Sequence, residues 1–191
     1  MTRIAERSPG FTIVELMVTV AVFAVLAALA VPSFTDFFDR SRVRGAGDEV
    51  LSLIATARAE AVENDLDVTL AFVDDGTNPW CIGANAAAAP LAGAPAAAAA
   101  PCDCTTVDAC MVADQQMVMT SADYEDVDIG ALPAAMTFDS MLGAVVPLGT
   151  RTVTLTSPSG KYDLVVQVNG LGQARLCTPD GKPGMSGVAR C

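Results

Sequence analysis

The chain has 191 residues, which suits one ordinary domain with an appendage and is short of two full domains. Apolar residues make up 52% of it and aromatic residues only 5%, so Ala and Val supply most of the hydrophobicity. The absence of histidine excludes Ser-His-Asp and Cys-His catalysis and His-ligated zinc or haem. A formal net charge of -11 argues against a broad nucleic-acid-binding surface. We therefore expect a protein that is not an enzyme and has no cofactor.

The first element in chain order is an apolar run from Phe11 to Val31, whose only charged residue is Glu15. As a helix that rises about 1.5 Å per residue, a run of this length spans a hydrocarbon core of roughly 30 Å. Residues 11–31 therefore predict a transmembrane helix. Arg3 and Arg7 precede it and favour a cytoplasmic N-terminus, although the basic residues at 40–44 weaken this argument from charge.

A second helical segment, residues 32–63, continues the first beyond Pro32, which removes a backbone hydrogen bond and predicts a kink. Gly45 and Gly47 each weaken a helix by about 1 kcal/mol relative to Ala, so we expect it to bend or melt locally near Arg44. Apolar residues recur at three- and four-residue steps and predict one buried face: Val43, Ala46, Val50, Leu53, Ile54, Ala57 and Ala61.

From residue 64 to residue 191 the sequence predicts a small antiparallel β domain, because the apolar period changes from 3.6 to 2. The expected strands are 66–73, 116–121, 136–140, 152–157 and 162–169. Residues 84–101 consist largely of Ala, Gly and Pro, without charge, and predict an exposed, variable loop. The expected fold class is α+β, a long N-terminal helix packed on a small antiparallel sheet domain.

Six cysteines, all in the second half of the chain, form either a disulfide set or a metal-binding set: Cys81, Cys102, Cys104, Cys110, Cys177 and Cys191. Thiolate zinc sites usually contain two C-x-x-C pairs, whereas the closest pair here is Cys102-Asp103-Cys104. We therefore favour disulfides, expect no metal, and place the domain in an oxidising compartment outside the cytoplasm. Cys177 and Cys191 pair naturally at the far end, which leaves two bridges among the other four cysteines and three pairings open.

The residues around the start of the apolar run carry a specific motif, Gly10-Phe11-Thr12-Ile13-Val14-Glu15-Leu16. It resembles the class III signal of type IV prepilins and pseudopilins. The resemblance implies that residues 1–10 are a leader, that a prepilin peptidase cuts after Gly10, and that Phe11 becomes the N-methylated first residue. The apolar helix then stays attached to the domain.

Glu15 is also a candidate on physical grounds. A carboxylate at the centre of a membrane helix costs about 2.5 to 3.5 kcal/mol by insertion scales, and less near the interface, so its presence suggests a function. The resemblance implies that Glu15 neutralises the Phe11 amine of a neighbouring subunit during filament assembly. The simpler alternative is a carboxylate that stabilises the positive N-terminus of its own helix.

Further features resemble a subgroup of these proteins. They are the helical stretch 57–65 (ARAEAVEND), the strand LDVTLAF, the element Trp80-Cys81-Ile82-Gly83, and the segment from Gly172 to Cys191. Together they are similar to the FimT/FimU/GspH group of minor pilins and minor pseudopilins. That resemblance implies a non-catalytic subunit that primes assembly or caps the tip of a type IV pilus, or a minor pseudopilin of a type II secretion system.

The same resemblance implies partners and a location. The partners are other minor pilins or pseudopilins and the major subunit, reached through the N-terminal helix, together with the prepilin peptidase. The subunit is expected in the bacterial inner membrane with its C-terminus in the periplasm, and then at the tip of the pilus or pseudopilus.

DNA binding for natural transformation is a further hypothesis, because some pilus members of the group bind DNA through a C-terminal G-R-x-R strand. Here Gln173 replaces the first Arg of that pattern, and within residues 172–191 positive charge comes only from Arg175, Lys182 and Arg190. Three cations on an acidic body release few counterions. We therefore expect weak DNA binding or none.

Overall fold

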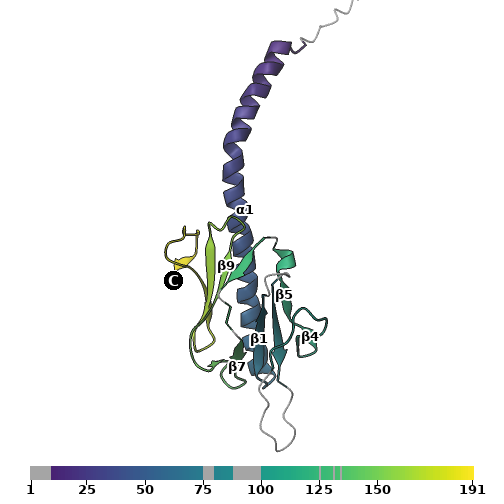
Figure 1. Ribbon diagram of the computed structural model, residues 1–191, viewed down its shortest axis with the longest axis vertical. Helices are drawn as coiled ribbons and strands as arrows, with labels where there is room; N and C mark the ends of the chain where they lie inside the picture. Colours follow the sequence, from purple (N-terminus) through teal and green to yellow (C-terminus); the bar gives the residue numbers. More distant parts are fainter. Residues whose placement is uncertain (1–9, 75–79, 88–99, 125, 131, 134) are drawn as a thin grey trace, which may run out of the picture. The chain divides into compact units, whose positions relative to one another are not determined.

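A computed structural model describes residues 10–74, 80–87, 100–124, 126–130, 132–133 and 135–191 (Figure 1). The chain forms two compact units, Met1–Phe38 and Asp39–Cys191. Most of the expected leader, residues 1–9, and most of the expected Ala/Pro loop, residues 88–99, lie outside the described part.

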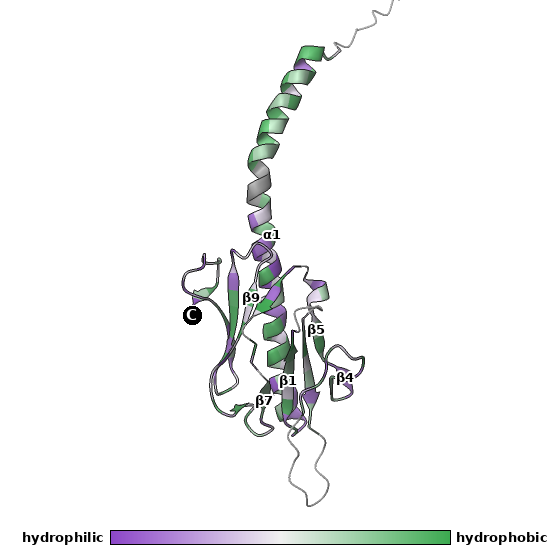
Figure 2. Ribbon diagram, viewed as in Figure 1, coloured by the Kyte–Doolittle hydropathy of each residue, from purple (hydrophilic) through white to green (hydrophobic). Residues whose placement is uncertain are grey.

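Helix α1 (Ile13–Glu63) is continuous through Pro32, although proline has no backbone N–H to donate there. Its first part is apolar, as the green ribbon in Figure 2 shows, and the large side chains there are exposed. Among the described residues it is the one helix that is long and apolar enough to cross a membrane. This agrees with the predicted spanning run. The side chains of residues 30–33 are not described, so the kink at Pro32 stays a prediction.

The second unit contains two five-stranded sheets and a two-stranded ribbon. One sheet has the order β5-β2-β1-β7-β8, with bounds Val118–Thr120, Cys81–Ala86, Val68–Val73, Met136–Phe138 and Val145–Val146. The other has the order β12-β11-β10-β9-β6, with bounds Ala189–Arg190, Ala174–Thr178, Asp163–Val168, Arg151–Thr156 and Asp128–Gly130. The ribbon joins β3 (Met111–Val112) to β4 (Gln115–Gln116), and a short 3-10 helix, η1 (Ser121–Asp123), follows β5.

All strand pairs in these sheets are antiparallel except β11 with β12, which is parallel. Each of the five predicted strand segments overlaps an observed strand, namely β1, β5, β7, β9 and β10. The expectation that the exposed loop begins at residue 84 is wrong, since β2 continues to Ala86 and Ala84 is fully buried. Backbone pairing with β1 on one side and β5 on the other keeps these small residues in the strand.

The core of the second unit lies between the C-terminal part of α1 and both sheets. The buried face of the helix consists of six residues without solvent exposure, all of them predicted from the apolar period: Val43, Ala46, Val50, Ile54, Ala57 and Ala61. Phe138, Leu155 and Leu164 contribute to the same core from the strands. Trp80 is also buried, and its indole Nε1 donates a hydrogen bond to the Val127 carbonyl at 2.6 Å.

Gly45 and Gly47 lie inside an unbroken stretch of α1, so the predicted local melting near Arg44 is wrong. A Cβ atom at Gly47 would lie 2.3 Å from Leu164 Cδ2 on β10. At Gly45 it would lie 3.0 Å from the ring of Tyr124, whose hydroxyl donates a hydrogen bond to Glu49. This bond to a carboxylate raises the pKa of Tyr124 to about 12. The two glycines therefore serve close packing of the helix on the β domain.

We predict that Gly47→Ala destabilises the domain, although Ala is the better helix former. The added methyl group has to displace Leu164 within a packed core, and such overpacking typically costs about 1 to 3 kcal/mol. Urea denaturation of the full chain in detergent measures this cost. Gly45→Ala is the matched control with a smaller expected loss, because its contact is with a half-buried ring. Equal or higher stability of Gly47→Ala would contradict the packing role.

Candidate functional site

The predicted processing site, Gly10-Phe11, lies just before α1, in a stretch without regular secondary structure. No described atom lies within 4 Å of the position that a Cβ would take at Gly10, and the Phe11 side chain is 84% exposed. The backbone at this junction is therefore accessible to an enzyme that binds an extended peptide.

Thr12 and Glu15 form a capping box at the N-terminus of α1. The Thr12 amide and hydroxyl both donate hydrogen bonds to Glu15 Oε2 at 2.9 Å, and the Glu15 amide donates to Thr12 Oγ1 at 3.2 Å. This reciprocal arrangement satisfies amide donors that a helix start otherwise leaves unpaired. Its sequence signature is the T-x-x-E spacing, a local signal from which the capping box could have been predicted. In the single chain Glu15 thus stabilises its own helix, the simpler of the two roles considered above.

Three disulfides use all six cysteines: Cys81–Cys104, Cys102–Cys110 and Cys177–Cys191. The last pair is the one expected at the far end, and the first two settle which of the three open pairings this structure contains. No group of His, Cys, Asp or Glu side chains suited to a metal ion occurs among the residues that the structure describes.

The two upstream disulfides pack directly on Gly83 of β2. A Cβ atom at this position would lie 2.3 Å from Cys110 Sγ and 2.9 Å from Cys104 Cβ. Asp103 lies between Cys102 and Cys104 in the sequence and accepts hydrogen bonds from the hydroxyl and the backbone amide of Thr105. These bonds hold the pKa of the Asp103 carboxyl below its usual value. The Trp80-Cys81-Ile82-Gly83 element therefore contributes one disulfide cysteine, Cys81. Its Gly83, which has no side chain, leaves room for both disulfides to pack against the sheet.

The three cations considered for DNA binding each have protein acceptors. Arg175 donates to Gln167 Oε1 through Nε at 2.9 Å and Nη2 at 2.6 Å. Lys182 Nζ donates to the Gly160 carbonyl at 2.7 Å and lies 3.1 Å from Asp163 Oδ1. Arg190 Nη1 donates to two carbonyls of the C-terminal segment, those of residues 179 and 182. Lys182 and Arg190 thus fasten the segment that the Cys177–Cys191 bridge closes.

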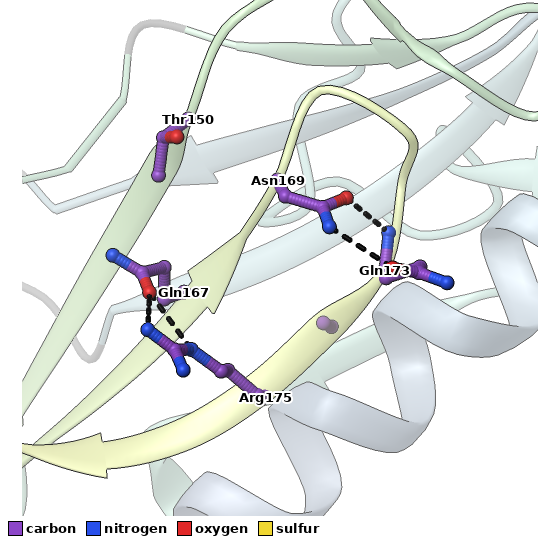
Figure 3. Close-up of a pocket in the computed structure, with 6 residues that line it drawn as sticks. Thr150, Gln167, Asn169, Gln173 and Arg175 are labelled. Carbon is purple, nitrogen blue, oxygen red and sulfur yellow. Dashed lines mark hydrogen bonds between the residues drawn. The ribbon is translucent and has the colours of Figure 1, made fainter. Parts of the chain in front are cut away.

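Arg175 also lines a polar pocket of about 520 Å³ on the second sheet (Figure 3). Along β10, Val166 and Val168 are buried in the core, so Gln167 between them faces the other side of the sheet, opposite Arg175 on β11. The remaining lining residues are Thr150, Asn169, Gln173 and Ala174. Two hydrogen bonds join Asn169 and Gln173 across the β10–β11 turn. Asn169 Nδ2 donates to Gln173 Oε1 at 3.0 Å, and the Gln173 backbone amide donates to Asn169 Oδ1 at 3.0 Å. The lining offers hydrogen-bond donors and one positive charge.

Comparison with known proteins gives two matching family models. The model described as Type II transport protein GspH matches residues 46–172, and the model described as Prokaryotic N-terminal methylation motif matches residues 7–31. The first therefore covers more than half of the chain.

Individual relatives match shorter parts of the chain. A fimbrial protein of Pseudomonas aeruginosa is 38% identical over 66 residues, which are 35% of this chain and 43% of that protein. The type IV major pilin protein PilA of Myxococcus xanthus (strain DK1622) is 35% identical over 65 residues, 34% of this chain and 30% of that protein. The chain thus matches less than half of the length of these relatives. A crystal structure of the type IV minor pilin FimU of Pseudomonas aeruginosa covers 73% of this chain and 91% of its own, with 18% identity and a TM-score of 0.47.

We predict that loss of the Cys177–Cys191 bridge lowers domain stability by roughly 3 kcal/mol, the chain-entropy value for a loop of this size. Thermal denaturation of the Cys191→Ala variant measures the loss, and limited proteolysis should then cut the segment between the two cysteines. The Cys177→Ala/Cys191→Ala double variant should be similar to the single one, since both lack the same bridge. An unchanged melting temperature would show that Lys182 and Arg190 hold this segment without the covalent bond.

Proposed function

We propose, from the premise that the chain belongs to the GspH family of minor pilins and pseudopilins, that it primes assembly or caps the tip of a type IV pilus. The observation that carries this proposal is the start of α1. There an accessible Gly10-Phe11 junction precedes a long, exposed apolar helix whose first turn carries the Glu15 carboxylate. Members of this family are structural subunits and generally non-catalytic, so the proposal assigns no reaction to the chain itself.

Processing at Gly10 would change the chemistry of the helix start. Cleavage by a prepilin peptidase removes residues 1–10 and leaves Phe11 with a free amine, which is positively charged unless deprotonated. Inside the apolar layer of a filament this charge needs a counter-charge, because an unpaired charge in a medium of low dielectric is costly. Glu15 is the single acidic residue in the apolar run and supplies it.

Glu15 already has a partner for one of its two carboxylate oxygens. Its Oε2 atom accepts both Thr12 hydrogen bonds in the single chain. We therefore infer that pairing with the Phe11 amine of a neighbouring subunit either uses the second carboxylate oxygen or replaces the bonds to Thr12. The capping box then holds the carboxylate in place before a partner arrives.

The proposed location follows from the same features. The spanning helix anchors the unassembled subunit in the bacterial inner membrane, and the three disulfides favour a periplasmic β domain because such bonds persist in oxidising compartments. After assembly the domain lies at the filament tip, next to other minor subunits and the major subunit.

Two other functions compete with a pilus role. A minor pseudopilin of a type II secretion system is favoured by the description of the matching family model, and it uses the same helix and the same processing site. DNA binding is less favoured, because each of the three candidate cations already has acceptors within the chain and the net charge is -11.

We predict that Glu15→Ala leaves the chain cleaved and inserted in the membrane but excludes it from filaments. The Phe11 amine of the neighbouring subunit would then lack its counter-charge. Immunoblots of membrane and sheared-filament fractions measure both properties. As a control for processing, Gly10→Phe should remain at precursor length in the membrane.

Thr12→Ala is the matched variant, since it removes the hydroxyl of the capping box and keeps the carboxylate. It should still enter filaments, because losing a cap costs only about 0.5 to 2 kcal/mol of helix stability. Equal exclusion of Thr12→Ala and Glu15→Ala would show that Glu15 acts through the helix start alone. Incorporation of Glu15→Ala at the normal level would contradict the proposal.

A further inference from the structure

Two exposed leucines flank the polar pocket around Arg175. Leu171 lies at the β10–β11 turn, between the lining residues Asn169 and Gln173, and is 64% exposed. Leu148 precedes the lining residue Thr150 by two positions and is 76% exposed. The two loops lie side by side, because the Val145 amide donates a hydrogen bond of 3.0 Å to the Gly170 carbonyl. The two loops thus place exposed apolar side chains beside the pocket.

The charge of the pocket differs from that of the chain as a whole. Arg175 is the single ionisable residue of the lining, whereas the chain carries 22 acidic and 11 basic residues. Its bonds to Gln167 use two of the five N–H donors of the guanidinium. Gln167 also fixes the orientation of this group, so little side-chain freedom remains to be lost when a ligand binds.

We propose that this surface, the Arg175 pocket with Leu148 and Leu171 at its rim, binds an acidic side chain of a different filament subunit. The carboxylate would enter the pocket and accept hydrogen bonds from Arg175, and apolar residues beside it would cover the two leucines. The inference rests on the proposed function, because only a filament subunit meets such a partner at high local concentration.

The chemistry favours this occupant over two others. A nucleic acid would gain one phosphate contact from Arg175 and nothing from the leucines, and its binding would oppose the charge of -11. A second copy of this chain would bring the same net negative charge, so two copies repel each other. Arginine is instead enriched at protein–protein interfaces, where surrounding contacts exclude water from it.

Site-specific photo-crosslinking in cells that assemble the filament tests this proposal with the full chain. A photoreactive residue replaces Leu171, and in matched chains it replaces Val107 or Val22. Val107 is an equally apolar residue, 79% exposed, in the segment between Cys102 and Cys110. Val22 lies in the apolar part of α1 and reports on entry into the filament.

We expect Leu171 to crosslink to a peptide of another filament subunit that contains Asp or Glu, and Val107 to crosslink much less. Arg175→Ala should lower the Leu171 product about tenfold, a loss that corresponds to about 1.4 kcal/mol. Lys182→Ala removes the same charge outside the pocket and should leave the yield unchanged. The Val22 product in the Arg175→Ala chain shows that this variant still folds and assembles.

Several results would overturn the inference. They are equal yields from Leu171 and Val107, a product with a second copy of this chain, a nuclease-sensitive product, and equal losses from Arg175→Ala and Lys182→Ala. If the Val22 product persists while one of these is observed, the proposed function stands and only the pocket assignment fails. Absence of the Val22 product together with an uncleaved chain would remove the proposed function and the inference with it.

Discussion

The close contact between the C-terminal part of α1 and the two sheets is the constraint on which the second unit depends. The buried helix face is made of Val, Ile and Ala, and Gly47 allows Leu164 to approach the helix backbone. Because one helix contributes to a core shared by both sheets, the opposite face of each sheet is available for other roles. On the second sheet that face carries the pocket around Arg175, and on the first sheet β2 supports two disulfides.

A core with few aromatic residues gains limited stability from each buried side chain, since small side chains remove little apolar area from water. The disulfides offset this by restricting the unfolded chain. Two of them lie against β2, which pairs with strands on both sides, and the third joins β11 to the end of the chain. Covalent bonds thus hold segments that contribute little to the shared core.

Sequence reasoning predicted the elements that follow a regular period. The spanning run, the buried face of residues 43–61 and strands such as β9 and β10 were foreseen, because apolar residues recur at 3.6 or 2 positions there. It failed where tertiary contacts override local tendency. Gly47 weakens an isolated helix yet is required for packing, and Ala84 was assigned to a loop because alanine and glycine carry no strand signal.

The candidate sites divide in the same way. The Gly10-Phe11 junction and Glu15 belong to one continuous motif, so they could be predicted from the sequence. The hydrogen bonds between Thr12 and Glu15 could also be predicted, from the three-residue spacing of the two residues. The pocket joins residues from β10, β11 and the segment before β9, so it depends on strand register, which no local pattern gives. For Arg175, only its presence and charge could be known in advance, and neither its bond to Gln167 nor its neighbours could be.

The disulfide Cys81–Cys104 also limits how far the chain can lengthen under tension. A protein domain that unfolds under force releases chain length that the folded state keeps compact. This bridge withholds the 23-residue separation between its cysteines, which at about 3.5 Å per residue is roughly 80 Å of extended chain. A domain with this bond intact is therefore shorter when fully extended than its reduced form, because the residues between the two cysteines stay out of the extended chain.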